Sequence, residues 1–264
     1  MDMKKITFTL ICAVLTMSLL LCGCLVDDPA NQTNAPTQVI TDNQGQTVVA
    51  PADATVSSSL IGDDVAQLNL ISNGNFYFVG SLTDANGEYT LMEMAKQNEN
   101  SYMGSQMDGV SVGFMHTGAD YYMVYPAGEC ALLLDDEVCA TLELDPTEMD
   151  MDTSKLSFGE LSKDQLINTS DALVDTAIAT CRTYQQDNGK TVKTYVSDGR
   201  LIRLQQFSAE GALLSTLDID ILTDAVPAEK VSIPSSYKTY SGSTGMLSFM
   251  LKFASAIGMD TFSE

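Results

Sequence analysis

The sequence predicts an α+β fold in which helices cover one face of a large antiparallel β-sheet. Turn dipeptides that end in glycine recur at short intervals after Leu60, and the runs between them alternate apolar and polar residues. Such a dipeptide between two alternating runs is typical of a β-hairpin. An apolar stripe at helical spacing near the C-terminus predicts a helix that covers the sheet.

The first residues of the chain combine a basic start, an apolar run and a cysteine motif. Ile6 to Leu21 is a stretch of 16 residues without charge, shorter than the roughly 20 residues that span a bilayer. Leu21-Cys22-Gly23-Cys24 follows and resembles the lipobox of bacterial lipoproteins. The resemblance implies a signal peptide that ends at Gly23 and a lipid anchor on Cys24. An uncleaved signal anchor is the alternative, and both place the rest of the chain on the extracytoplasmic face of the cell membrane.

Asp27 to Ser59 is rich in Asn, Gln, Thr, Asp, Ala and Ser and has no aromatic residue. Such a segment buries too little apolar area to offset its ordering entropy, so we predict a flexible, disordered tether. The predicted organisation is a lipoprotein signal peptide at 1–23, a lipid-anchored tether at 24–59, a sheet domain at 60–242 and an amphipathic helix at 243–264.

The net charge excludes one class of partner. The chain carries -22, and loss of Asp2, Lys4 and Lys5 with the signal peptide leaves -23. Such a charge repels phosphate backbones and anionic headgroups, so we expect no nucleic-acid partner and membrane attachment through the acyl anchor alone.

The turn dipeptides set the predicted strands. They are Asn86-Gly87, Asp108-Gly109, Thr117-Gly118, Asn188-Gly189, Asp198-Gly199 and Glu210-Gly211. The strands expected around them are Gln67–Ile71, Asn75–Leu82, Glu88–Lys96, Ser101–Met107, Val110–His116, Asp120–Tyr125, Ala131–Leu134 and Val138–Leu142, with three or four more between Ala177 and Leu222. Between Thr147 and Leu173, Ser162 and Gln165 form a capping-box pattern that predicts a helix or two across the sheet.

The alternation places apolar residues on one face of the sheet, where helices, closure of the sheet or a ligand must cover them. Methionines concentrate in the first strands, and their flexible thioethers suit ligands of variable shape, whereas gap-filling in a core is the alternative reading. The residues expected to line a ligand cavity are Phe76, Phe78, Met92, Met94, Val112, Phe114, Met123, Leu217 and Ile219.

The C-terminal segment predicts an amphipathic helix. Ser243 is a plausible cap and Gly258 a stop. The expected apolar stripe consists of Met246, Phe249, Met250, Phe253 and Ile257. Packing on the sheet edge and a role as a lid or interfacial contact are both compatible with this stripe.

Residues suited to catalysis are few. His116 is the only histidine and is expected in an exposed turn. The acidic run of Asp145, Glu148, Asp150 and Asp152 lacks the glycine turn of a calcium loop and reads as a solvated connector. We therefore expect no enzyme activity, no metal and no cofactor.

Cys130, Cys139 and Cys181 are the cysteines that follow Cys24. A hairpin turning at Asp135 to Glu137 would place Cys139 opposite Leu132 or Leu133, which disfavours a Cys130–Cys139 disulfide. A disulfide and buried free thiols both remain open.

Four motifs occur in an order similar to that in LolA/LppX-type lipoprotein carriers. They are Gly74-Asn75-Phe76-Tyr77-Phe78-Val79-Gly80, Asp120-Tyr121-Tyr122-Met123-Val124-Tyr125-Pro126, Ser197-Asp198-Gly199-Arg200-Leu201-Ile202 and Ile233-Pro234-Ser235-Ser236-Tyr237. The resemblance implies a strongly curved antiparallel half-barrel whose concave face is covered by helices and encloses a hydrophobic cavity.

These observations predict a membrane-anchored lipoprotein that binds a lipid or another hydrophobic ligand in a half-barrel cavity without catalysis. The alternative is a cell-envelope sensor or interaction module in which the same fold binds an envelope protein and no ligand.

Overall fold

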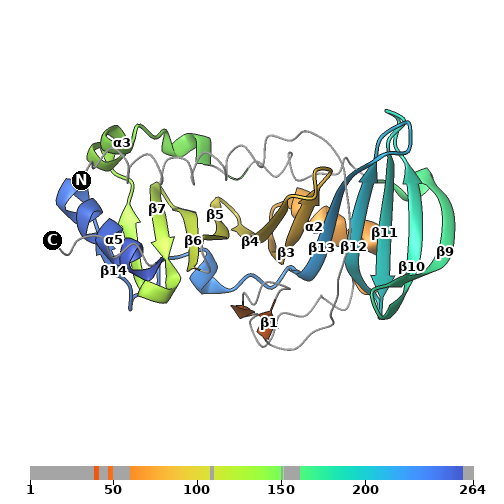
Figure 1. Cartoon of the computed structure of the whole chain (residues 1–264), viewed down its shortest axis with the longest axis horizontal. Helices are drawn as coiled ribbons and strands as arrows, with labels where there is room; N and C mark the ends of the chain where they lie inside the picture. Colours follow the sequence, from red (N-terminus) through yellow and green to blue (C-terminus); the bar gives the residue numbers. More distant parts are fainter. Residues whose placement is uncertain are drawn as a thin grey trace. The chain divides into compact units, whose positions relative to one another are not determined.

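The computed structural model (Figure 1) describes residues 39–41, 47–49, 60–107, 110–149, 151 and 161–257. The predicted signal peptide, Cys24, Asp150, Asp152 and Gly258 lie outside these residues. Within the predicted tether, β1 (Val39–Thr41) pairs antiparallel with β2 (Thr47–Val49). The sequence predicted no strand there, so the structure differs from the prediction at this point.

A mostly antiparallel sheet of 12 strands forms the body of the chain, in the order β14-β8-β7-β6-β5-β4-β3-β13-β12-β11-β10-β9. The strands are β3 (Phe76–Asp84), β4 (Tyr89–Gln97), β5 (Asn100–Met107), β6 (Val110–Thr117), β7 (Asp120–Tyr125), β8 (Cys130–Leu133), β9 (Leu166–Val174), β10 (Ala177–Gln185), β11 (Thr191–Ser197), β12 (Arg200–Phe207), β13 (Leu213–Thr223) and β14 (Lys238–Tyr240). The turn dipeptides therefore located β3 to β8 and the four strands from β10 to β13 correctly. Only β14 pairs in parallel, with β8, among the strand pairs with a described register.

The chain divides into two compact units. The α5 unit contains residues 95–151 and 228–257 as far as they are described, and thus β5 to β8, β14, α3 (Asp136–Leu142) and α5 (Gly242–Ala256). The α2 unit contains residues up to Met94 and from 161 to 227, and thus α2 (Asp64–Asn73), β3 and β9 to β13. Short 3-10 turns lie at η1 (Pro126–Gly128), η2 (Pro146–Met149), η3 (Lys163–Gln165) and η4 (Ala228–Lys230).

The core of the α5 unit lies between strands β6 to β8 and the helices α3 and α5. Phe249, Met250 and Phe253 of α5 are buried, and Met246 and Ile257 pack against the same cluster, as the apolar stripe predicted. Helix α5 lies against β8 and β14, the last strand at its end of the sheet. The remaining members of the cluster are Phe114, Met123, Tyr125, Cys130, Leu132, Leu134, Val138 and Leu142.

The start of α5 is joined to the start of α3 by hydrogen bonds. The Asp135 carboxylate accepts from the backbone N–H of Val138 at 2.9 Å and of Gly242 at 2.8 Å. These two bonds hold the pKa of Asp135 below its ordinary value. Ser243 does not cap the helix as predicted, because Ser241 occupies the N-cap position and the Ser243 hydroxyl donates to Glu137.

Helix α2 replaces a predicted strand. The prediction of a strand at Gln67–Ile71 is wrong, since Asp63 caps the helix by accepting from Ala66 N at 3.0 Å and Gly74 ends it with a positive φ of 81°. Val65, Leu68 and Ile71 are buried at helical spacing. An apolar run of this length is compatible with a helix or a strand. The capping residues Asp63 and Gly74 were therefore the better indicators of a helix.

Two buried polar side chains attach α2 to the sheet of its own unit. Asp64 is 2% exposed and accepts hydrogen bonds from Arg182 at 2.5 Å, from the Tyr184 hydroxyl at 2.8 Å and from the Thr194 hydroxyl. Gln67, which is 0% exposed, donates to the carbonyls of Leu60 and Gly199 and accepts from Leu201 N. Because every one of these buried groups has partners, the helix is fixed in one position.

Two further segments differ from the prediction. Residues 138–142 belong to helix α3, because Asp135 caps a helix where a hairpin turn was expected. The capping box of Ser162 and Gln165 is present, but it caps the single turn η3, and strand β9 follows in place of a helix. The β-branched residues Ile167, Thr169 and Val174 of β9 favour the extended form over the helix that the capping box suggested.

None of the described helices is long and apolar enough to cross a membrane.

We predict that Asp64→Ala destabilises the full-length chain by about 3 kcal/mol or more, because it leaves Arg182 and two hydroxyls without their buried acceptor. The measurement is urea unfolding at pH 7. Lys163→Ala is the matched control, since Lys163 pairs with Asp63 at 2.5 Å with 71% of its side chain exposed, and its loss should cost less than about 1 kcal/mol. Equal losses in the two variants would contradict this account of how α2 is held.

Candidate functional site

The nine residues predicted to line a ligand cavity divide between the two units. Val112, Phe114 and Met123 belong to the α5 unit, and the α2 unit contains the other six, Phe76, Phe78, Met92, Met94, Leu217 and Ile219. Within the α5 unit, Phe114 lies directly opposite Met123 across β6 and β7, and Val112 packs against the same core. These three residues are therefore brought together.

The six members in the α2 unit are packed as core. Phe76 and Phe78 are 0% exposed, and Phe78 pairs with Leu222 across β3 and β13. The Phe78 ring lies against Gly80, where an added Cβ would come within 2.8 Å of the ring. Met92 is half-buried, and Met94, Leu217 and Ile219 are buried. Close packing of this kind fits the gap-filling reading of the methionines here.

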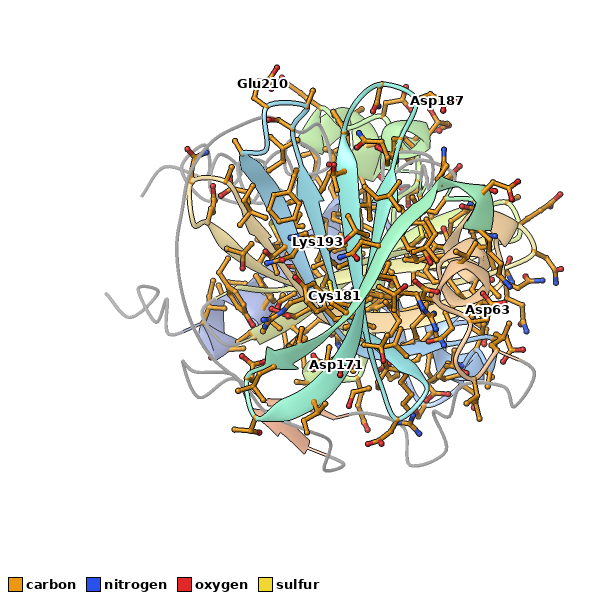
Figure 2. All side chains as sticks on the ribbon, turned by 90° about the vertical axis from the view of Figure 1, so that its right-hand side faces the viewer. Asp63, Asp171, Cys181, Asp187, Lys193 and Glu210 are labelled. Carbon is orange, nitrogen blue, oxygen red and sulfur yellow. The ribbon has the colours of Figure 1, made fainter. Side chains whose placement is uncertain are left out.

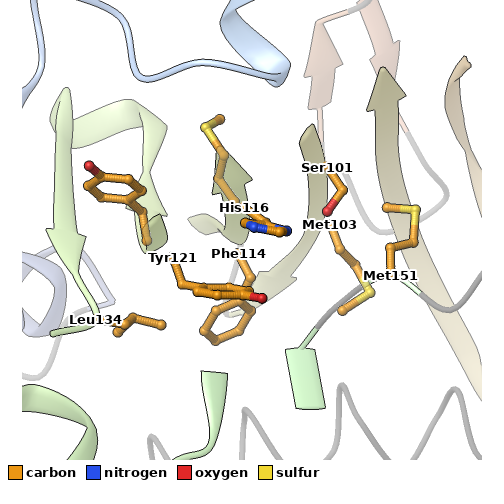
Figure 3. A pocket seen from close by; sticks show the side chains of 9 residues that line it. Ser101, Met103, Phe114, His116, Tyr121, Leu134 and Met151 are labelled. Atoms are coloured by element: carbon orange, nitrogen blue, oxygen red, sulfur yellow. The ribbon is translucent and has the colours of Figure 1, made fainter. Parts of the chain in front are cut away.

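A small pocket opens within the α5 unit (Figure 3). It has room for about one water molecule. An acyl chain therefore does not fit it in this conformation. The lining residues are Ser101, Met103, Phe114, Met115, His116, Tyr121, Tyr122, Leu134 and Met151.

His116 lies at the end of a strand, as predicted, but it is half-buried in this pocket and does not stand in an exposed turn. Its ring stacks on Tyr121 with centroids 4.2 Å apart and planes 9° apart, as Figure 3 shows. Ser101 lies opposite His116 across β5 and β6, and the imidazole Nε2 is 3.1 Å from Gly118 O.

The chemistry that this lining offers is limited. It contains one imidazole, hydroxyls and thioethers, and none of the nine lining residues is a carboxylate. Across the described parts of the chain, no three His, Cys, Asp or Glu side chains cluster closely enough to hold a metal ion. In the acidic run that begins at Asp145, the Asp145 carboxylate accepts hydrogen bonds from Thr147 N at 2.9 Å and from the Thr147 hydroxyl.

Sequence reasoning did not find the pocket. Tyr121 and Leu134 reach it only through the register of β6, β7 and β8, and Met151 comes from beyond η2. Alternation within Val110 to Thr117 was the available signal, since it sets His116 and Phe114 on the same face.

All three cysteines in the described chain are free thiols. Cys130 is buried in β8, and Cys139 lies in α3 with its thiol donating to Leu134 O at 3.3 Å. Burial raises the pKa of both thiols. No disulfide joins Cys130 to Cys139. The hairpin that was expected to keep these two residues apart does not form, because helix α3 occupies its second half.

Three acidic residues of the α2 unit lie near one another, and two of them form ion pairs with Arg203. Arg203 pairs with Asp218 on the neighbouring strand and with Asp175 at 3.3 Å. Asp220 lies where the register of β13 against β3 shifts, between Ile219 and Ile221. Although the Asp220 side chain is exposed to solvent, desolvation by the atoms packed around its carboxyl and the nearby Asp218 charge raise its pKa to about 6.

No protein-family model and no curated protein matches the sequence. Solved structures similar to the chain include the Pseudomonas aeruginosa MucA/MucB complex, at 13% identity and a TM-score of 0.36 over 67% of this chain and 62% of that one. A LolA superfamily protein from Nitrosomonas europaea matches at 11% identity and a TM-score of 0.24, over 65% and 97% of the two chains. An uncharacterized conserved protein from Thermus thermophilus matches at 9% identity and a TM-score of 0.34, over 67% and 96%.

We predict that Asp220 makes the folded state less stable as the pH rises from about 4 to about 6. Its pKa in the folded chain lies above the ordinary 3.8, so over this range the folded state binds the extra proton and the unfolded state does not. Asp220→Asn should remove this component of the pH dependence, measured by urea unfolding at several pH values. Solvent screening of the exposed side chain keeps the effect small. An unchanged slope in the variant would rule out Asp220 as its source.

Proposed function

We propose that this protein is a non-catalytic binding protein, held on the extracytoplasmic face of the membrane by a lipid on Cys24, whose ligand is a lipid or another hydrophobic molecule. The ligand binds in the α5 unit, between helix α5 and the strands that it covers. The observation that carries the proposal is the way α5 is attached. Its covering face is almost wholly apolar and contains Phe249, Met250 and Phe253, which are 1%, 8% and 2% exposed.

Apolar contacts can be exchanged for a ligand at low cost. The Phe253 ring packs edge-on against Tyr125, and the Phe249 ring against Tyr240. An acyl chain that replaces these rings restores the buried apolar area, because the hydrophobic effect is not directional. Met123 and Met250 add flexible walls that adapt to chains of different shape.

The polar contacts of α5 lie toward its ends. Gly242 N donates to Asp135, Ser243 donates to Glu137, and the Lys252 ammonium donates to Gly128 O. A helix held at its start can swing away from the strands while the first contacts persist. In this proposal the cavity of a half-barrel carrier is filled by the side chains of α5 until a ligand displaces them.

The anchor and the tether supply the location. Attachment through Cys24 brings the chain to the membrane although its net charge of -22 repels anionic headgroups. As a coil throughout, the 33 residues from Asp27 to Ser59 would span on the order of 30 Å, and the pairing of β1 with β2 within them shortens this reach. The proposed protein therefore meets lipid at the surface without inserting into it.

A protein-interaction module is the second candidate function. Large apolar side chains exposed on β9 and β10 favour it, with Leu173 at 72% and Ile178 at 77% exposure. This surface belongs to the α2 unit and is independent of the contacts under α5.

We predict that weakening the α5 cover increases ligand affinity. In the full-length chain, Phe249→Ala with Phe253→Ala removes buried contacts worth about 3 kcal/mol or more each, so the open form becomes more populated. The affinity for a fluorescent long-chain fatty acid should rise by at least about tenfold. Titration of the probe by fluorescence measures this change.

Leu247→Ala with Leu251→Ala is the matched control, because these leucines lie on α5 with 49% and 41% exposure. It should leave the affinity unchanged. Met123→Lys, introduced together with the two phenylalanine changes, places a charge in the proposed site and should abolish the gain. A gain that survives Met123→Lys, or the absence of probe binding in every variant, would exclude a site under α5.

A further inference from the structure

Strand β9 is the last strand at its end of the sheet and pairs only with β10 among the strands that the structure describes. Figure 2 looks onto this strand, where Asp171 is labelled. Seven of its nine residues are exposed, with only Ala172 half-buried and Val174 buried. The outer edge of β9 therefore presents a row of backbone donors and acceptors to solvent.

Apolar side chains accompany this open edge. Leu173 and Ile178 lie directly opposite each other across β9 and β10, at 72% and 77% exposure. Ile167 and Leu166 at the start of the strand are 61% and 40% exposed. A strand added beside β9 would bring its own side chains against Leu173 on this face.

The edge has few of the features by which proteins usually block strand addition. Within Leu166–Val174 there is no proline and no lysine, and Asp171 is the single charge. The register with β10 is continuous from Asn168 to Val174 and shifts only beyond Asn168. At the other end of the strand order, β14 is three residues long, begins with Lys238 and packs against α5.

The charges around the edge indicate the chemistry of an occupant. Asp164 and Asp171 are exposed, and neither makes an ion pair with any residue that the structure describes. The cations beside the strand are Lys163 and Arg182 of β10, which lies opposite Thr169, and they are already paired with Asp63 and Asp64, each at 2.5 Å. A second copy of this chain would bring the same acidic edge and a further charge of -22. The electrostatics therefore disfavour self-pairing and favour a basic segment.

We propose that β9 is a docking site for an extended segment of a partner protein. The segment adds to the sheet as a new strand along residues 168–174, places apolar residues against Leu173, beside which Ile178 extends the apolar face, and carries basic residues near Asp171. Main-chain hydrogen bonds supply affinity, while the apolar pair and the carboxylate supply selectivity. This site goes beyond the proposed ligand site under α5 and does not depend on it.

The test uses the full-length chain and a synthetic nine-residue peptide of alternating valine and lysine. Binding is followed by fluorescence anisotropy, and hydrogen exchange reports the amides of 168–174. We expect the peptide to bind and to slow exchange at these amides. Leu173→Thr with Ile178→Thr keeps the charge and the β propensity, and it should weaken binding by at least about tenfold.

Asp171→Lys should weaken binding of the lysine peptide and reduce its preference over a peptide of alternating valine and glutamate. Leu247→Thr on α5 is the control and should change neither affinity, because this leucine is exposed elsewhere, in the α5 unit. Thermal unfolding checks that each variant is folded.

Three results would overturn the proposal. The first is failure of both peptides to bind. The second is that the lysine peptide binds the threonine variant as tightly as it binds the unchanged chain, which would mean that net charge alone drives binding. The third is a dimer of the chain that the threonine changes dissociate, since a second copy would then occupy the edge. None of these results bears on the fatty-acid measurement, so the two proposals fail separately.

Discussion

The apolar face of an antiparallel sheet has to be covered, and in each unit of this chain a helix does so in a different way. Helix α2 is attached through buried, fully hydrogen-bonded polar groups, with Asp64 bound to Arg182, Tyr184 and Thr194. Helix α5 covers its strands with apolar side chains and keeps its polar contacts toward its ends. Directional buried bonds specify one position, whereas apolar contacts can be exchanged. In the proposed function, this difference separates a permanent cover, α2, from one that a ligand replaces, α5.

The same contrast applies to the two ends of the strand order. Strand β14 is short and packs against α5, while β9 is long and open. An exposed nine-residue edge carries an aggregation risk that proteins normally suppress. An open edge next to the exposed pair of Leu173 and Ile178 is explained if a partner strand covers it. The chain's charge of -22 favours a basic partner. In the two proposals, the hydrophobic ligand and the protein partner bind to separate units.

Much of the sheet could be predicted from the sequence because glycine turns have a strong local signal. Positive φ at Gly87, Gly118, Gly189 and Gly199 marks the hairpins whose strands were located correctly. The errors fall on short apolar runs, at α2 and α3, where length and periodicity do not separate helix from strand. Capping by Asp63 and Asp135 decided these segments, and β9 was missed because a real capping box was extended into a helix.

The site was less accessible to sequence reasoning. Phe114 and Met123 could be identified as interior residues, but that α5 fills the space beside them depends on tertiary packing. The position of His116 followed from strand periodicity, whereas its stacking on Tyr121 depends on the register of β6 and β7. The open edge of β9 required the strand order, which no local pattern contains.

The central claim is that α5 is a displaceable cover while α2 is not. Native-state hydrogen exchange of the full-length chain measures this directly, since it gives an opening free energy for each amide. The account predicts that the amides of α5 exchange through a local opening of lower free energy than those of β7 and β8 beneath it, and that α2 exchanges with its sheet. Exchange of α5 only through global unfolding, at the same free energy as β7 and β8, would contradict it.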